Sequence, residues 1–192
     1  MTEIMMPWSA HINLDNGLLW HPRRIITRHL SDMADMYRDP DAVKAELESR
    51  DPLVYRVDEI EVPQEVGHLL YSVTVIYPGK VGDEFYMTKG HFHVREECAE
   101  VYVGLQGRGY LLMQTRDGWC THLEMQRGTV AYVPPYWAHR TINIGHEPFV
   151  FYAIYPAQAG HDYRSIEETG FGMRVVERNG QPVLIPNEQH GG

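Results

Sequence analysis

The sequence predicts an all-β domain, a sandwich or small barrel, with short helices near its amino terminus. Three observations lead to this fold class. Short apolar runs rich in Val, Ile and Tyr alternate with polar residues, which is typical of strands with one buried face. The 17 glycines and 12 prolines fall between these runs, so the strands are short and closely spaced. Helical patterns, by contrast, occur only in the first quarter of the chain.

Two short helices are expected in that first quarter. Ser31 can cap a turn that continues to Tyr37. Asp39 then gives an N-cap followed by Pro40 at the first position of a helix that runs through residues 42–48. We expect both helices to pack on the outside of the strands.

Five apolar runs account for most of the predicted strands. They cover residues 69–77, 99–105, 109–114, 129–133 and 149–155. Asp117 and Gly118 lie between two apolar runs and predict a hairpin turn. The expected organisation is therefore one domain with three parts. These parts are a helical extension over residues 1–50, a barrel over 51–186 and a tail over 187–192.

Composition excludes several classes of protein. The 192 residues suffice for one domain with a sizeable core. With 17 Lys and Arg against 26 Asp and Glu, the net charge of −9 argues against a nucleic-acid partner. Two cysteines supply neither a disulfide scaffold nor a four-cysteine zinc site. No apolar run reaches membrane-spanning length and the first residues lack a signal-peptide pattern, so we expect a cytoplasmic protein with no membrane partner.

One group of histidines stands apart from the others, which are scattered singly. His91 and His93 are two residues apart, so an extended backbone places both imidazoles on one face, about 6–7 Å apart. Glu100 and Tyr102 share one face of the next predicted strand in the same way, and His139 follows a later strand and a Pro-Pro turn. Three imidazoles and one carboxylate form a mixed set of ligands suited to Fe, Mn, Ni or Zn.

The spacing of these residues resembles the two sequence motifs of the cupin superfamily. The first motif is matched at His91, His93, Glu100 and Gly107, and the second at Gly128, Pro134, His139 and Asn143. Two details differ from the general pattern. Six residues separate His93 from Glu100 where the motif has three or four, and Tyr136 stands where the second motif has a glycine. The longer gap points to one branch of the superfamily.

That branch is the cupin-type phosphoglucose isomerases, best known from archaea. The resemblance is carried by blocks at residues 88–93, 99–103, 133–141, 153–157 and 159–163. It implies a cupin jelly-roll, or double-stranded β-helix, barrel with the amino-terminal helices packed outside. It also implies interconversion of glucose 6-phosphate and fructose 6-phosphate, in glycolysis and gluconeogenesis, by a homodimer.

The resemblance assigns a role to each residue of the site. The implied metal ligands are His91, His93, Glu100 and His139, holding one divalent transition metal per subunit, with iron expected first and Mn, Ni or Zn as alternatives. The implied phosphate and sugar contacts are Thr74, Thr88, Gly90, Tyr102, Tyr155, His161 and Tyr163. All of these positions hold the residue type that the family has there.

The chemistry of an aldose–ketose isomerase suggests how these residues act. Moving hydrogen between C1 and C2 through a cis-enediol needs a base close to these carbons and stabilisation of the developing oxyanion. Glu100 is the only carboxylate of the group and is the expected base, with Tyr102 as proton donor or orienting group. A metal-assisted hydride shift is the other route. Strand alternation turns Lys89 away from the face of Thr88, so Lys89 is left out of the site.

Two other functions remain open from the residues. Cupin dioxygenases use the same three histidines and one glutamate, but they leave the Thr and Tyr set unexplained. A non-enzymatic sugar-binding cupin, of the type fused to regulators, would carry a helix-turn-helix segment, which the pattern does not show, and would not need Glu100 and His139 together. Without the resemblance, Tyr102, Tyr155 and Tyr163 would be interpreted as ordinary tyrosines of amphipathic strands.

Overall fold

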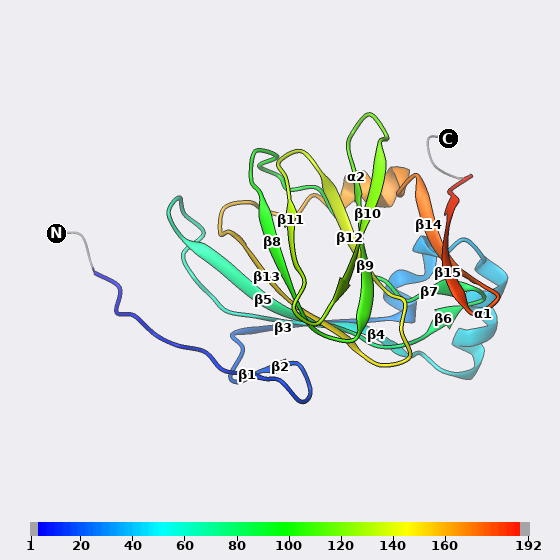
Figure 1. Cartoon of the computed structure of the whole chain (residues 1–192), viewed down its shortest axis with the longest axis horizontal. Helices are drawn as coiled ribbons and strands as arrows, with labels where there is room; N and C mark the ends of the chain where they lie inside the picture. Colours follow the sequence, from blue (N-terminus) through cyan, green and yellow to red (C-terminus); the bar gives the residue numbers. More distant parts are fainter. Residues whose placement is uncertain (1–3, 189–192) are drawn as a thin grey trace.

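Antiparallel sheets account for most of the molecule, as the alternating apolar runs predict (Figure 1). The structure is a computed structural model and describes residues 4–188. Its largest sheet has six strands in the order β11-β8-β13-β5-β4-β3. In that order the strands are Val130–Val133, Glu100–Gln106, Phe149–Pro156, Leu69–Ile76, Leu53–Glu59 and Arg24–His29.

A three-stranded sheet packs against the inner face of the six-stranded one. Its order is β10-β9-β12, with bounds Cys120–Gln126, Arg108–Gln114 and Ala138–Asn143. The rings of Tyr102 on β8 and His139 on β12 meet across the two sheets, with centroids 5.8 Å apart. Phe149 on β13 lies so close to Gly109 on β9 that a Cβ there would come within 2.1 Å of its ring. The space between the two sheets is the barrel interior.

The remaining elements lie outside this barrel. A four-stranded sheet has the order β15-β14-β7-β6, with bounds Gln181–Pro186, Met173–Arg178, Glu84–Phe85 and Lys80–Val81. The short strands β1 and β2 are Ile12–Asn13 and Leu18–Leu19, and the helices η1, α1 and α2 are Leu30–Met36, Pro40–Ser49 and Arg164–Thr169. Figure 1 shows α1 at the side of the barrel where the four-stranded sheet lies, and α1 packs beside η1 and β6. None of the helices within residues 4–188 is long and apolar enough to span a membrane.

The five predicted runs all form strands, namely β5, β8, β9, β11 and β13, and the predicted turn joins β9 to β10. The helix expected after Asp39 is confirmed, since its carboxylate accepts from Ala42 N–H at 2.9 Å. The preceding helix begins at Leu30 rather than after Ser31, whose hydroxyl donates to Asp51 instead.

The prediction that helices occur only in the first quarter is wrong, because α2 follows the barrel strands. The first quarter also contains the strand β3, which was not expected there. β3 shows no clear alternation because it is an outer strand whose side chains are mostly exposed or half-buried. α2 has six residues, which is too short to show a helical period in the sequence.

An extended segment beside β12 completes the wall of the barrel. It is held by isolated bridges between Met87 and Ile142 and between His91 and His139. The segment has five residues from Met87 to His91, where β12 has only four from His139 to Ile142. Gly90, with φ of +75°, is the extra residue. Such a bulge resets the alternation of side chains. Thr88 and His91 consequently both face the barrel interior, which a regular strand would not permit.

Tyr136, at the position where the cupin motif has glycine, adopts the left-handed backbone that glycine favours. Its φ is +71°, and its N–H donates to the carbonyl of Glu96 at 2.7 Å. The side chain is exposed, so the ring itself clashes with nothing. The tight turn before β12 is thus retained without the glycine, at the energetic cost of a strained residue.

Candidate active site

The four side chains predicted as metal ligands meet at one point of the barrel interior. Glu100 lies at the start of β8, His139 lies on β12, and the other two histidines follow the bulge at Gly90. One ligand atom from each of His91, His93, Glu100 and His139 lies within 4.8 Å of the other three. The set can therefore converge on a single ion.

Backbone carbonyls orient two of the imidazoles. Nδ1 of His93 lies 3.0 Å from the carbonyl oxygen of Cys98, and Nδ1 of His139 lies 3.4 Å from that of Trp137. Since a carbonyl only accepts, each Nδ1 carries a proton, and each ring is held with Nε2 directed at Glu100, where a neutral ring could bind a metal ion. The Nε2 atom of His91 is buried and has no hydrogen-bond partner among residues 4–188, and the buried Nε2 atom of His139 faces the Glu100 carboxylate. A buried nitrogen without a partner is costly, and a metal ion between these groups would coordinate both imidazoles.

The charges within the cluster suit a cation. Oε2 of Glu100 lies 2.9 Å from Nε2 of His139 and 3.3 Å from Nε2 of His93. Burial alone would raise the pKa of Glu100, but the two imidazoles outweigh it and lower the pKa to about 2. Burial, then the nearby His139, lowers the pKa of His91, which is therefore neutral. Burial and the Glu100 carboxylate raise the pKa of Tyr102, so its phenol keeps the proton.

A cavity of about 80 Å³ opens beside the cluster. All seven positions predicted to contact phosphate and sugar line it, namely Thr74, Thr88, Gly90, Tyr102, Tyr155, His161 and Tyr163. His91, Glu100 and His139 line it as well, whereas His93 does not. The structure therefore brings every predicted site residue into one place, with the cavity on one side of the cluster.

Aromatic ring contacts connect the cluster to the wall that precedes α2. The ring of His161 lies 4.4 Å from that of His91 and 5.7 Å from that of Tyr163, measured between centroids. Burial lowers the pKa of His161 to about 4, so this imidazole is neutral at pH 7. A neutral imidazole and a phenol offer hydrogen-bond donors to an anion without adding charge.

The sequence analysis missed Glu59 and Arg28, which also line the cavity from β4 and β3. Residues paired directly opposite in a sheet share a face, and Glu59, Ser72, Ala153 and Tyr102 form one row across β4, β5, β13 and β8. Burial raises the pKa of Glu59 despite the opposing effect of Arg24. Alternation along β4 could have placed Glu59 on the inner face, but only the register shows which residues it meets.

Comparison with known proteins agrees with this geometry. A family model described as "Glucose-6-phosphate isomerase (GPI)" matches residues 27–190. The chain belongs to this family. The glucose-6-phosphate isomerase of Pyrococcus furiosus is 48% identical over 181 residues, which cover 94% of this chain and 95% of that protein. The glucose-6-phosphate isomerase of Thermococcus kodakarensis is 47% identical over 185 residues, covering 96% and 97%.

The family membership confirms the cupin prediction made from the motifs, and the antiparallel barrel is the expected all-β fold. Solved structures with a similar arrangement include an oxalate decarboxylase from Lactobacillus farciminis in complex with formate. It is 21% identical, with a TM-score of 0.46, over 57% of this chain and 30% of that chain.

Proposed function

We propose that this chain interconverts glucose 6-phosphate and fructose 6-phosphate and that the reaction depends on a divalent metal. One observation carries the proposal. Three imidazoles converge with the Glu100 carboxylate at the edge of a cavity lined by hydroxyl, imidazole and amide groups. Membership of the glucose-6-phosphate isomerase family supports the same reaction.

The metal in this proposal is held by the cluster of three histidines and Glu100. Its donor set of imidazole and carboxylate accommodates Fe, Mn, Ni or Zn, and we propose Fe first because the resemblance to the cupin-type isomerases implies it. When bound, such an ion supplies positive charge that polarises sugar oxygens. The protein carries a net charge of −9, so this local positive charge also helps to attract an anionic substrate.

The phosphate group binds the donors on the cavity wall. Thr88, Tyr155 and Tyr163 supply hydroxyls, and the neutral ring of His161 supplies one N–H. The bulge at Gly90 brings backbone into the same wall. Hydrogen bonds to a charged phosphate oxygen are the strong ones, so this set can hold the dianion without a glycine-rich phosphate loop.

Glu100 is the base of the proposed mechanism. Its ionised carboxylate borders the cavity, and the proton it removes from C2 of the aldose or C1 of the ketose leaves a cis-enediol. Tyr102 lies two residues along the same strand and keeps its phenolic proton, which suits it to donate to the neighbouring sugar oxygen. A hydride shift between C1 and C2 is the competing route.

We further propose that the chain acts in the cytoplasm as a homodimer. The chain carries an exposed apolar set on the edge strand β11 and on the strand ends, including Val130 and Tyr132, which a second copy would cover. Light scattering on the purified protein tests the dimer, and a mass of one chain at micromolar concentration contradicts it.

Turnover of fructose 6-phosphate by the purified protein, followed through glucose 6-phosphate, tests the proposed function. Oxygen uptake is measured in the same preparation with small aromatic and dicarboxylic substrates, because a dioxygenase would consume oxygen. In deuterated water, label at the exchanged carbon of the product supports the enediol and excludes an exclusive hydride shift. Oxygen uptake without isomerisation would contradict the proposed function and would indicate a dioxygenase instead.

A further inference from the structure

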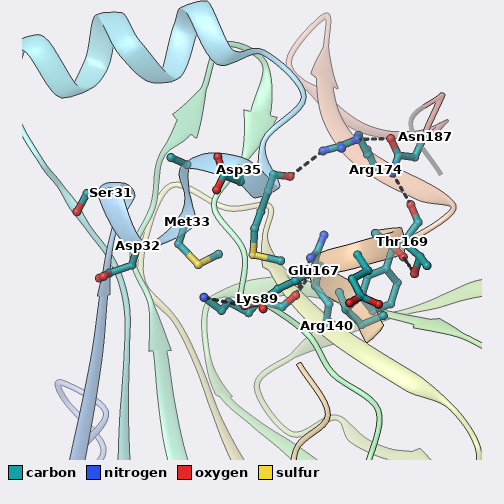
Figure 2. A pocket seen from close by; sticks show the side chains of 16 residues that line it. Ser31, Asp32, Met33, Asp35, Lys89, Arg140, Glu167, Thr169, Arg174 and Asn187 are labelled. Carbon is teal, nitrogen blue, oxygen red and sulfur yellow. Dashed lines mark hydrogen bonds and ion pairs between the residues drawn. The ribbon is translucent and has the colours of Figure 1, made fainter. Parts of the chain in front are cut away.

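A second cavity of about 410 Å³ lies outside the barrel, between η1, α2 and the start of β14 (Figure 2). It is several times larger than the cavity of the candidate active site and falls in the size range of small-molecule sites. Figure 2 shows Lys89, Arg140 and Arg174 lining it, with Glu167 beside Lys89. None of the proposed catalytic or metal-binding residues lines this cavity.

The second cavity shares its wall with the active site. Arg140 lies on β12 between His139 and Thr141, and its side chain points to the opposite face of the strand. Nη2 of Arg140 donates to the carbonyl of Lys89 at 2.6 Å, and Nε donates to the same oxygen at 3.3 Å. The backbone that carries Thr88 is therefore tied to a side chain of the second cavity.

Arg140 is a buried cation without a carboxylate partner among the described residues. It is 5% exposed, and its guanidinium lies over the ring of Phe171, 4.6 Å from the centroid. Arginine keeps its charge in proteins, so this guanidinium is a buried cation. The other two cations have partners: Lys89 lies 3.1 Å from Glu167, and Arg174 lies 2.9 Å from Glu84.

The acidic residues of the cavity do not neutralise Arg140. Asp32, Asp35 and Glu168 are exposed. Asp32 accepts from the backbone N–H of His29 at 2.9 Å, and Glu168 pairs with Arg164 at 2.6 Å. Within residues 4–188, Nη1 of Arg140 makes no hydrogen bond, and the carboxylate that acts on this guanidinium electrostatically, that of Glu84, is bonded to Arg174. A desolvated guanidinium in this position is energetically costly, and a carboxylate or phosphate oxygen in direct contact would remove that cost.

We propose that this cavity binds a small anion through a carboxylate or phosphate group that contacts Arg140. Arg is well suited to that role, because its guanidinium presents several donors in one plane to two oxygens at once. Met33 and Met36 of η1 form part of the opposite wall, and the apolar remainder of the ligand packs there.

Binding at this site changes the active site through the carbonyl of Lys89. A new partner for the guanidinium competes with that carbonyl and shifts the backbone between Thr88 and Gly90, both of which line the candidate active site. The anion is thus an effector of the sugar-phosphate reaction. This effect rests on the proposed function, whereas binding itself does not.

Methyl NMR of the zinc-loaded protein with ¹³C-methyl methionine tests the binding. Methionine lines the second cavity at Met33 and Met36, and none lines the active-site cavity. The probes are malonate, which carries only carboxylates, and inorganic phosphate. We expect the two methyl resonances to shift and saturate with at least one probe, and the probe that saturates them identifies the group preferred.

Two variants make this result specific. Arg140→Met should abolish the shifts. Ala34→Trp fills the cavity from η1, away from Lys89 and Arg140, and should abolish them while leaving turnover without anion unchanged. Absence of saturable shifts with both probes up to tens of millimolar overturns the proposal. Shifts of normal size in the folded Ala34→Trp protein also overturn it.

The effector role has its own measurement. We expect the saturating probe to change the KM for fructose 6-phosphate by about fivefold or more in the unaltered enzyme. In Ala34→Trp only direct competition at the active site should remain, so the difference between the two proteins measures the coupling. Equal KM changes in both overturn the effector role. A protein without isomerase activity refutes the proposed function instead, and the methyl shifts then still decide on binding.

Discussion

The two cavities lie on opposite faces of the same two stretches of backbone, residues 88–91 and 139–141, yet they hold charge in different ways. On the inner face the groups are mainly imidazoles and hydroxyls, with Glu59 and Arg28 at the wall and the Glu100 carboxylate, whose charge is stabilised by two histidines. On the outer face the groups are ion pairs and one arginine that has no carboxylate in ion-pair contact within residues 4–188. The inner face needs a cation to complete it, and the outer face needs an anion.

This difference shows how one wall of the barrel can carry a cation site on its inner face and an anion site on its outer face. Side chains alternate along extended backbone, so neighbouring residues such as His139 and Arg140 belong to different sites. As a consequence, both cavities depend on the same backbone segments. Gly90 is the point of closest approach, because its missing side chain leaves room for Arg140 and Phe171 on one face and for the cavity on the other.

Metal removal should have the largest effect and should act only on the inner face. A strong chelator should reduce turnover to the uncatalysed rate, because the cluster then lacks its cation, and a divalent transition metal should restore it. His139→Ala should weaken metal binding by about tenfold or more. Metal analysis accompanies each assay. Full turnover by protein that carries no metal would remove the metal from the reaction.

The next largest effect should separate the two carboxylates of the inner cavity. Glu100→Gln should reduce kcat by about 10²–10⁴-fold, as expected for loss of a general base. Glu59→Gln is the matched control on the facing strand, and it should cost less than about tenfold, since Glu59 is not assigned the proton transfer. Steady-state kinetics at measured metal occupancy checks both. The reverse order of the two losses would make Glu59 the base.

A methyl group at Gly90 should damage both cavities together. A Cβ there would lie 2.7 Å from Phe171 and 2.9 Å from Cβ of Arg140, and the φ of +75° disfavours any side chain. Gly90→Ala should lower the free energy of unfolding by about 2–4 kcal/mol. Gly118→Ala has a φ of +86° but open space around it, so it should cost only about 1 kcal/mol. Denaturant unfolding of both variants measures the difference, and equal losses would mean that Gly90 is not crowded.

The smallest effect should come from a single phosphate donor. Thr88→Val removes a hydroxyl of the inner face, and a hydrogen bond to a charged group is worth about 1.5–3 kcal/mol, so kcat/KM should fall about ten- to hundredfold. Thr88→Ser keeps the hydroxyl and should retain most activity. The hydroxyl of Thr88 also accepts from Thr141 N–H at 3.1 Å, so unfolding is measured in parallel. Loss of stability without loss of kcat/KM would assign Thr88 a structural role only.

The local parts of this molecule are predictable because they depend on short spacings. The strands follow from alternation, the helix after Asp39 from its cap, and part of the candidate site from pairs of residues two apart, namely His91 with His93 and Glu100 with Tyr102. The family motifs add His139 to that cluster. Elements without a local signal, β3 and α2, were not predicted.

Tertiary structure alone decided the rest. Glu59 reaches the active-site cavity because the register of four strands puts it in one row with Tyr102, and register depends on the packing of whole sheets. The same holds for the outer face. Alternation predicts that Arg140 points away from His139, but only the covering helices η1 and α2 make it a buried cation beside a cavity. The sequence by itself determined which side chains are available to each face, and long-range packing determined which of them meet, because no local spacing encodes the distance between elements far apart in the chain.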